Sequence, residues 1–424
     1  MKPLPIPLSR DRHGEASSQL GRGGLWMDHK KSSRPILFWL ISLIFVLLFS
    51  SLSTRLWGGK PEKIEEPRPL TIQEDMTLAE FGKANQLPSS VLKSVFGLTT
   101  KEDLQKKLKD CRLSVEEINK QVNKALVLQS EHESKNWVKI PVKFVSWLIF
   151  LGIVFFLVRK NRITPQKRKG LFTASVMIFG VILGSDPSPM GTVKDAIVLF
   201  AKSGVIFPPR MLALLIFLLM VFVSNKFICA WGCQFGTLQD LLFRFNRNPK
   251  DQKAILRQLK PPFVLSNTIR ATFFFLIILA AFLWATDLVE PIDPFRVFNP
   301  LHAGVAGLLF IGALSFFSLF IYRPWCHFFC PFGFVGWVVE KVSLFKINVN
   351  YQTCIACEAC AKACPSTVME AILKQNRIIP DCFACATCVH TCPTNSVHFE
   401  LKKRKKPPAG KFEKKSSTSA LEKG

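Results

Sequence analysis

The sequence is poor in tyrosine and in acidic residues. It has 2 Tyr against 38 Phe and 9 Trp, and 30 Asp and Glu against 56 Lys and Arg. So few polar aromatics, with 49% hydrophobic residues, argue against an ordinary soluble protein. The formal charge of +26 would suit nucleic acid. The basic residues flank apolar segments, however, so we expect a membrane protein with no nucleic-acid partner.

Two further motifs are missing. No C-x-x-C-H occurs, which excludes a covalent c-type haem. The first apolar stretch is followed by "LSTRLWGG", which lacks a small-residue cleavage site. We therefore expect a retained signal anchor, with cleavage as the alternative.

Six apolar stretches approach the roughly 20 residues that a membrane-spanning helix needs. Basic residues crowd the N-terminal segment, the second and fourth connections and the tail, whereas the third and fifth connections are acidic or mixed. This alternation predicts a multi-pass protein of the cytoplasmic (inner) membrane, in contact with the lipid bilayer and with both termini in the cytoplasm. The predicted spans are 36–57, 142–158, 171–183, 211–228, 268–286 and 303–321.

The composition changes along the chain and divides it into six parts. Residues 58–140 alternate short helical patterns with cap signals, including a capping box at Ser114 and Glu117, and predict an extracytoplasmic all-helical domain. Its lone Cys111 is expected to be a buried structural thiol. The parts are a basic cytoplasmic N-terminus (1–35), a transmembrane anchor (36–57), the helical domain (58–140), a membrane domain (141–345), a cysteine-rich domain (346–401) and a basic disordered tail (402–424).

The membrane domain contains an internal repeat of two spans each. "NKFICAWGCQFGT" and "YRPWCHFFCPFGF" align so that each copy ends in a Cys-x3-Cys pair, expected at the cytoplasmic face. The adjacent glycines and proline indicate that the helix breaks there, so the pairs can turn toward a common point. Whether they bind an additional metal or cluster, pack as structural thiols, or form transient disulfides stays open. The cysteines are Cys229, Cys233, Cys326 and Cys330.

The cysteine-rich domain carries the most specific signal. "CIACEACAKACP" and "CFACATCVHTCP" are both C-x2-C-x2-C-x3-C-P, the two-cluster ferredoxin arrangement, in which the fourth ligand comes from the other run. Structural zinc is the alternative. The fold class is then an α-helical integral membrane protein with a C-terminal α+β ferredoxin domain. The crossed pattern assigns Cys354, Cys357, Cys360 and Cys392 to one [4Fe-4S] cluster, and Cys382, Cys385, Cys388 and Cys364 to the other.

These motifs together resemble the membrane-bound polyferredoxin family. Its members include the quinol dehydrogenase subunit of periplasmic nitrate reductase systems, the nitrous oxide reductase maturation protein and a cytochrome oxidase assembly ferredoxin. The resemblance covers roughly residues 171–401. The chain departs from the family pattern at Gln234, where proline is usual, and this leaves the geometry of the first turn open. It also lacks the flavin-attachment motif of the nitrous oxide member.

The resemblance implies electron exchange between the quinone pool and a redox partner, a reductase or cytochrome. The chain would be an electron-transfer subunit of a quinol dehydrogenase-type system and not a stand-alone enzyme. Asp186, Asp293 or Glu290 could accept protons from quinol, although Asp-Pro pairs also simply begin turns. A metal-reducing assembly factor for another metalloenzyme and a redox sensor are the alternative functions.

Overall fold

The structure of the protein is a computed structural model. It describes residues 29–57 and 69–408, apart from 74, 99, 101, 112 and 403, together with residue 412. Most of the predicted basic N-terminus (1–35) and of the predicted tail (402–424) lies outside the described residues.

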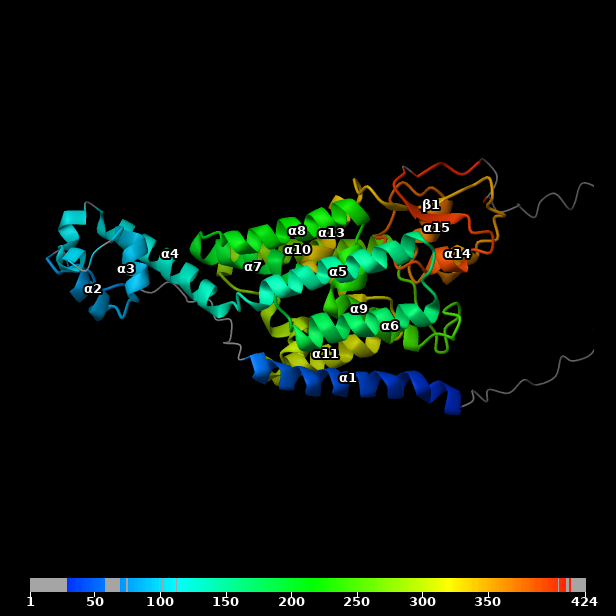
Figure 1. Ribbon diagram of the computed structural model, residues 1–424, viewed down its shortest axis with the longest axis horizontal. Helices are drawn as coiled ribbons and strands as arrows, with labels where there is room; N and C mark the ends of the chain where they lie inside the picture. Colours follow the sequence, from blue (N-terminus) through cyan, green and yellow to red (C-terminus); the bar gives the residue numbers. More distant parts are fainter. Residues whose placement is uncertain are drawn as a thin grey trace, which may run out of the picture.

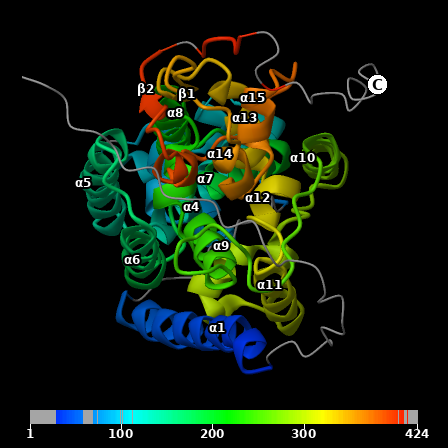
Figure 2. The ribbon, with the colours of Figure 1, turned by 90° about the vertical axis from the view of Figure 1, so that its right-hand side faces the viewer.

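Long apolar helices form the outside of the membrane domain. Viewed from the end, they surround a group of shorter helices (Figure 2). Three of them are long and apolar enough to cross a membrane: α1 (His29–Trp57), α5 (Lys139–Arg159) and α10 (Phe263–Trp284). The helices α8 (Pro208–Ser224) and α11 (Val305–Phe317) are apolar but shorter. Large side chains such as Leu48, Leu148 and Leu309 are more than 60% exposed on the outer surface, as expected for contact with lipid.

The third predicted span has a composite structure. It begins as α6 (Pro165–Ser175), where Pro165 follows the N-cap Thr164, and continues as a π-helical segment, Val176–Ile182. Wide helical turns of this kind are common at functional sites. The sequence prediction of six spans therefore corresponds to three long helices, two shorter apolar helices and one composite helix.

The small helical domain (residues 69–134) folds around its own core. It contains α2 (Leu78–Ala84), α3 (Ser89–Phe96), two 3-10 turns and α4 (Val115–Ser134). The predicted capping box at Ser114 and Glu117 is present at the start of α4. Cys111 is only half-buried and packs at the edge of this core, so the expectation of a fully buried thiol is wrong.

The shorter helices fill the centre of the bundle. They are α7 (Pro189–Ser203), α9 (Gln234–Phe245), α12 (Pro324–Phe328) and α13 (Pro331–Glu340). Every residue of α9 from Gln234 to Arg244 is buried, although the helix carries Asp240 and Arg244. A polar helix buried on all sides needs internal partners for its charges.

Each repeat ends in a re-entrant hairpin, which the sequence did not predict. The chain reverses after α8 at Asn225 (φ 59°), runs back as the π-helical segment Ile228–Gly232, and turns at Cys233 into α9. The second copy reverses at Arg323 (φ 48°), returns through α12 and turns at Cys330 into α13. Both turns thus point back into the bundle.

The depth of these turns can be read along α5. The indole N–H of Trp147 donates a hydrogen bond to the carbonyl of Gly232 at 2.9 Å. Trp147 lies eight residues after Lys139 and twelve before Arg159, about 12 Å and 18 Å at 1.5 Å per residue. The expectation that the cysteine pairs emerge at the cytoplasmic face is therefore wrong, because the hairpins carry them to the middle of the helix bundle.

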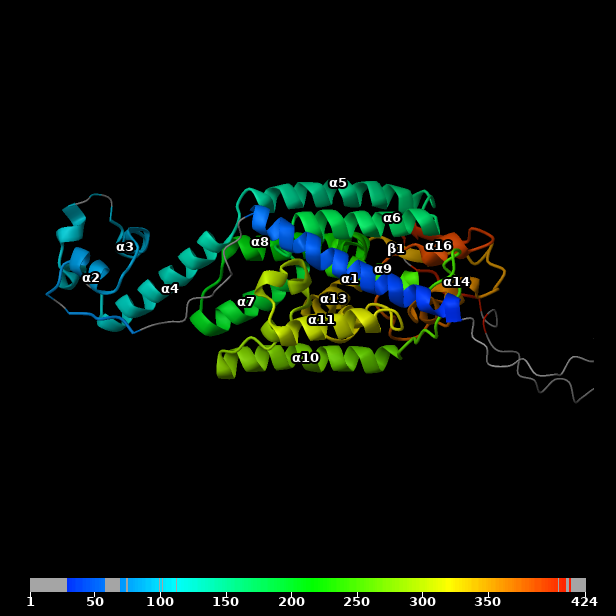
Figure 3. The same cartoon turned by 90° about the horizontal axis from the view of Figure 1, so that it is seen from below.

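The ferredoxin domain packs at one end of the bundle, and the small helical domain lies at the opposite end (Figure 1). Strands β1 (Lys346–Val349) and β2 (Val397–Glu400) pair antiparallel, and the short helices α14 (Ala359–Ala363), α15 (Val368–Leu373) and α16 (Thr387–Thr391) lie between them in the chain. Phe155 near the end of α5 stacks edge-on against Phe345 and Phe399 of this domain. Figure 3 shows α4 leading from the small helical domain to the start of α5.

Candidate iron-sulfur sites

The two cysteine runs of the ferredoxin domain adopt the same backbone conformation. Ala356 and Ala384, two residues after the first cysteine of each run, have φ of 56° and 48°. Glu358 and Ala386, which follow the second cysteine, have φ of 56° and 60°. Left-handed conformations cost a non-glycine residue about 1–2 kcal/mol each. Such strain at four equivalent positions marks a functional loop, and it wraps the chain so that the thiols face inward.

The first crossed set lines one cavity. Cys354, Cys357, Cys360 and Cys392 line it together with mainly apolar side chains. Cys392 ends α16 in an extended conformation, as expected before Pro393. Its sulfur accepts a hydrogen bond from the N–H of Ser396 at 3.2 Å.

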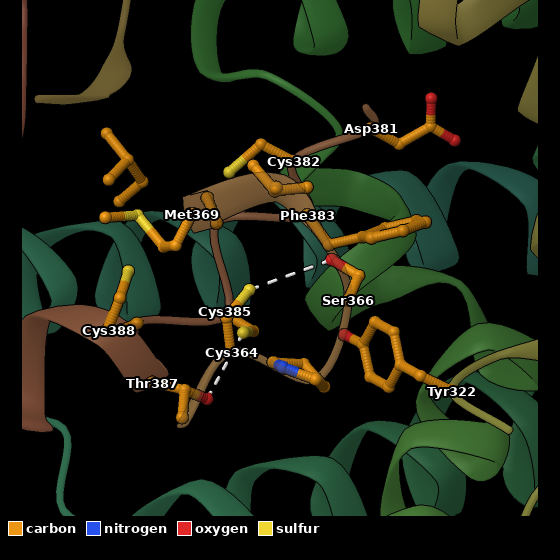
Figure 4. A pocket seen from close by; sticks show the side chains of 15 residues that line it. Tyr322, Cys364, Ser366, Met369, Asp381, Cys382, Phe383, Cys385, Thr387 and Cys388 are labelled. Carbon is orange, nitrogen blue, oxygen red and sulfur yellow. Dashed lines mark hydrogen bonds between the residues drawn. The ribbon is translucent and has the colours of Figure 1, made fainter. Parts of the chain in front are cut away.

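The second crossed set lines another cavity, which Figure 4 shows from close by. The thiol of Cys385 lies 3.3 Å from the hydroxyl of Thr387, and that of Cys364 lies 3.7 Å from the hydroxyl of Ser366. The remaining cysteines of this cavity are Cys382 and Cys388.

Electrostatics disfavour leaving these thiols metal-free and ionised. Burial, and next the neighbouring Cys392, raise the pKa of Cys360 to about 12. Burial raises the pKa of Cys382 further still. Burial also acts to raise the pKa of Cys392, but hydrogen bonds from Thr394 and Ser396 outweigh it and the pKa falls below its usual range. Buried, crowded thiolates are stable only beside positive charge, such as iron.

The donor geometry distinguishes a cluster from a single ion. Among the described residues, no three His, Cys, Asp or Glu side chains are close enough together to bind one metal ion. Four sulfurs around a single zinc ion stand close together, at about 2.3 Å from the metal. Sulfurs around an iron-sulfur cube stand farther apart because the cube lies between them. The four-cysteine linings of the two cavities supply the donor set that an iron-sulfur cube takes.

The two membrane turns have the same geometry despite the proline-to-glutamine departure. Cys233 and Cys330 have φ/ψ of −71°/113° and −66°/117°, and each is the N-cap of the following helix. The N–H of Cys233 donates to Ile228, and that of Cys330 donates to Trp325, in each case five residues back. Gln234 therefore replaces proline without changing the turn, and its amide donates to the carbonyl of Ser185 instead.

The structure brings all four membrane cysteines to one cavity. Its lining includes Cys229, Cys233, Cys326 and Cys330. The outer connections also contribute to it, through Met190 of α7 and Phe295 of the 3-10 segment Pro294–Phe298.

Buried ion pairs link the hairpins to the ferredoxin domain, and sequence reasoning missed them. Lys226 lies 2.9 Å from Asp381, the residue before Cys382, and Arg270 binds the same carboxylate. Arg247 donates to the carbonyl of Ala363 at 3.2 Å. In this network six cations share three carboxylates: Asp240 binds Arg244 and Arg323, Asp251 binds Arg168, Arg244 and Arg247, and Asp381 binds Lys226 and Arg270.

The charge pattern of the loops contained a signal for this network. Arg244 and Arg247 belong to the basic fourth connection, which we interpreted only as a topology signal. Acidic residues are scarce in this chain, so an isolated aspartate among arginines indicates a buried ion pair.

The candidate proton acceptors differ in their surroundings. Asp293 caps a 3-10 segment by accepting from the N–H of Phe295 at 2.9 Å, so it does begin a turn. Loss of hydration raises its pKa to about 6, against the opposing charge of Lys194. Asp186 lines a cavity near the start of α5. Glu290 is exposed and pairs with Arg296 at 3.3 Å.

Comparisons with known proteins agree with this geometry. A family profile described as "4Fe-4S binding domain" matches residues 206–250 and 303–350, once over each copy of the repeat. The matched residues include both Cys-x3-Cys turns. No solved structure matches the chain.

Three curated proteins are similar to parts of the chain. YccM of Escherichia coli, named provisionally as an electron transport protein, is 34% identical over 182 residues, or 40% of this chain and 49% of YccM. The ferredoxin-type methylamine utilization protein MauN of Paracoccus denitrificans is 28% identical over 46% of this chain and 66% of its own. NirI of the same organism is 26% identical over 53% of this chain and 35% of its own.

The chain spans about half the length of YccM and a third of that of NirI. The profile match covers both Cys-x3-Cys turns and ends before the eight ferredoxin-type cysteines, which begin at Cys354. The chain contains a match to a 4Fe-4S binding domain and is similar to electron-transport and ferredoxin-type proteins, which agrees with the resemblance to the polyferredoxin family.

Proposed function

We propose that this protein is a multi-pass subunit of the cytoplasmic membrane that exchanges electrons between the quinone pool and a redox partner protein through two [4Fe-4S] clusters. The single observation that carries the proposal is the gathering of eight cysteines into two four-thiol cavities at one end of an apolar helical bundle. When bound, such a cluster accepts and donates one electron at a time.

The ligand assignment is part of the proposal. Cys354, Cys357, Cys360 and Cys392 hold one cluster, and Cys382, Cys385, Cys388 and Cys364 hold the other. The four-sulfur cavities, the inward-facing loops and the N–H donated to Cys392 support it. Cys357 is the exposed member of the first set, so this edge of the domain suits electron exchange with a reductase or cytochrome.

The six-span topology, with both termini in the cytoplasm, is supported by the surface. The helices present exposed apolar side chains around the bundle, and the ferredoxin domain and the small helical domain occupy opposite ends. An apolar belt between two polar ends fits a bilayer. With the ferredoxin domain in the cytoplasm, the small helical domain lies outside.

A cavity near the outer end of α5 is the proposed site for the quinone ring. It lies between Trp57 at the end of α1, Lys139 at the start of α5, and the loop that carries Asp186. Oxidation of one quinol to quinone releases two electrons and two protons. The electrons leave singly toward the ferredoxin domain, and the carboxylates of Asp186 and Asp293 accept the protons in the outer connections.

Quinone exchange in lipid nanodiscs tests this function. We expect chemically reduced protein to be reoxidised by added quinone, or oxidised protein to be reduced by quinol, as seen by electron paramagnetic resonance of the clusters. Thr54→Trp fills the proposed cavity and should slow the exchange at least tenfold. Leu52→Trp, on the exposed side of the same helix, is the matched control and should not.

Two outcomes contradict the proposal. Clusters that respond to dithionite but exchange no electrons with quinol or quinone would remove the quinone pool from the function. Stoichiometric reduction of a bound transition-metal ion under those same conditions would favour the metal-reducing assembly factor instead.

A further inference from the structure

The cavity between the two membrane turns has the properties of a third cluster site. Its four thiols have nearly equal exposed fractions, 7% for Cys229 and Cys233 and 8% for Cys326 and Cys330. The deeply placed thiols of the ferredoxin cavities, such as Cys364 and Cys382, show the same 7–8%. Thiols that were simply packed in a core would fill their space and leave no shared cavity.

The site between the membrane turns has the same kind of lining as the ferredoxin sites. Each of the three sites is lined by four cysteines together with mainly apolar side chains. The cavity at the outer end of α5 has no thiol in its lining. The membrane turns therefore offer the same set of sulfur donors as the sites proposed to hold clusters.

The two hairpins hold each other in place by reciprocal cations. Lys226 and Arg323 occupy the same position, three residues before the first cysteine of each copy. Arg323 donates to the carbonyls of Cys229 and Ala230 in the other hairpin. Lys226 donates to the carbonyl of Gly333 in return. This exchange fixes the two cysteine pairs face to face.

The surroundings favour an anionic occupant. Lys226 is a buried cation that lines the cavity, and it shares the carboxylate of Asp381 with Arg270. The indole N–H of Trp325, another lining residue that is 1% exposed, has no hydrogen-bond partner among the described residues. A buried donor without an acceptor is costly. A cluster held by four thiolates is a net anion with sulfur acceptors, and so satisfies both features.

The backbone supplies a sulfur contact of the kind that such a site needs. The N–H of Gly333 donates to the sulfur of Cys330 at 3.3 Å. A side chain at Gly236 or Gly333 would approach the carbonyl of the first cysteine of its motif within 2.7–2.8 Å. Both turns thus require glycine, and the second directs an amide at a thiol.

We propose that Cys229, Cys233, Cys326 and Cys330 bind a third [4Fe-4S] cluster near mid-depth of the membrane domain. It neighbours the second ferredoxin site, because Phe383, which follows Cys382, lines both cavities. The third cluster site lies between the outer quinone cavity and the ferredoxin domain. Its place on the electron path rests on the proposed function.

Iron and acid-labile sulfide per chain, measured on full-length protein purified without oxygen, test the proposal. We expect about twelve irons, four for each cluster. The double variant Cys233→Ser, Cys330→Ser should retain about eight. Cys111→Ser, which changes the one cysteine outside the cavities, is the matched control and should keep about twelve. The ferredoxin signals in electron paramagnetic resonance report whether the double variant is folded.

The wild-type count tests the proposal without any variant. About eight irons per chain in a preparation with full ferredoxin signals would overturn it, as would one zinc or copper ion bound at the membrane thiols. About twelve irons without electron exchange with quinone would leave the third cluster in place and refute the proposed function instead.

Discussion

Replacing Asp381 by asparagine should loosen the ferredoxin domain from the bundle. The carboxylate is 0% exposed and binds Lys226 and Arg270, which are 0% and 1% exposed. Asparagine keeps the size of the side chain and removes its charge, so both cations lose their shared partner at once.

The size of the effect follows from this burial. Removing one partner of a buried ion pair costs about 3–5 kcal/mol, because the remaining charge stays buried without compensation. With about 2 °C per kcal/mol for a folding unit of this size, the apparent Tm should fall by about 6–10 °C. The contrast is the pair Glu370 and Lys374, whose side chains are 52% and 53% exposed, so that water screens their attraction.

Tryptophan fluorescence during heating in detergent, without oxygen, measures both variants. Asp381→Asn should lower the apparent Tm by several degrees, while Glu370→Gln should change it by about 1 °C or less. Equal shifts in the two variants would refute the reasoning, because they would mean that water reaches Asp381.

Two further predictions follow from the site. Gly333→Ala places a Cβ 2.7 Å from the carbonyl of Cys326, so it should remove about four irons per chain by elemental analysis, whereas Gly312→Ala, which meets open space, should remove none. An unchanged count in Gly333→Ala would contradict the turn geometry. Quinol-linked electron transfer should rise with pH around 6, because Asp293 accepts a proton only when ionised and its pKa is raised to about 6. A stopped-flow pH profile should lose this step in Asp293→Asn; a step that persists in that variant would assign it to another group.

The sequence was informative where chemistry fixes spacing. Cysteines around a cluster must recur at short intervals, so the runs beginning at Cys354 and Cys382 predicted two crossed groups, and the cavities gather the same two groups. Helix capping is equally local, and the box at Ser114 and Glu117 is present. The repeat could be recognised because both copies keep the same cysteine and glycine positions.

The sequence was uninformative where distant segments meet. An apolar run followed by a cysteine pair looks the same whether the chain leaves the membrane or turns back, and only the left-handed Asn225 and Arg323 show the reversal. In a hydropathy analysis, Lys226 likewise counts only as a charge at the end of a membrane span. Its actual role depends on Asp381, which is 155 positions away and contributes no local pattern.

This long separation constrains how the protein is made. The hairpin that carries Lys226 leaves the ribosome well before Asp381 has been synthesised, and a cation cannot remain uncompensated in an apolar interior at low cost. The partly synthesised membrane domain must therefore keep water around Lys226 until the ferredoxin domain has been made and covers it. A chain that ends before residue 381 lacks this partner and leaves Lys226 without its buried carboxylate.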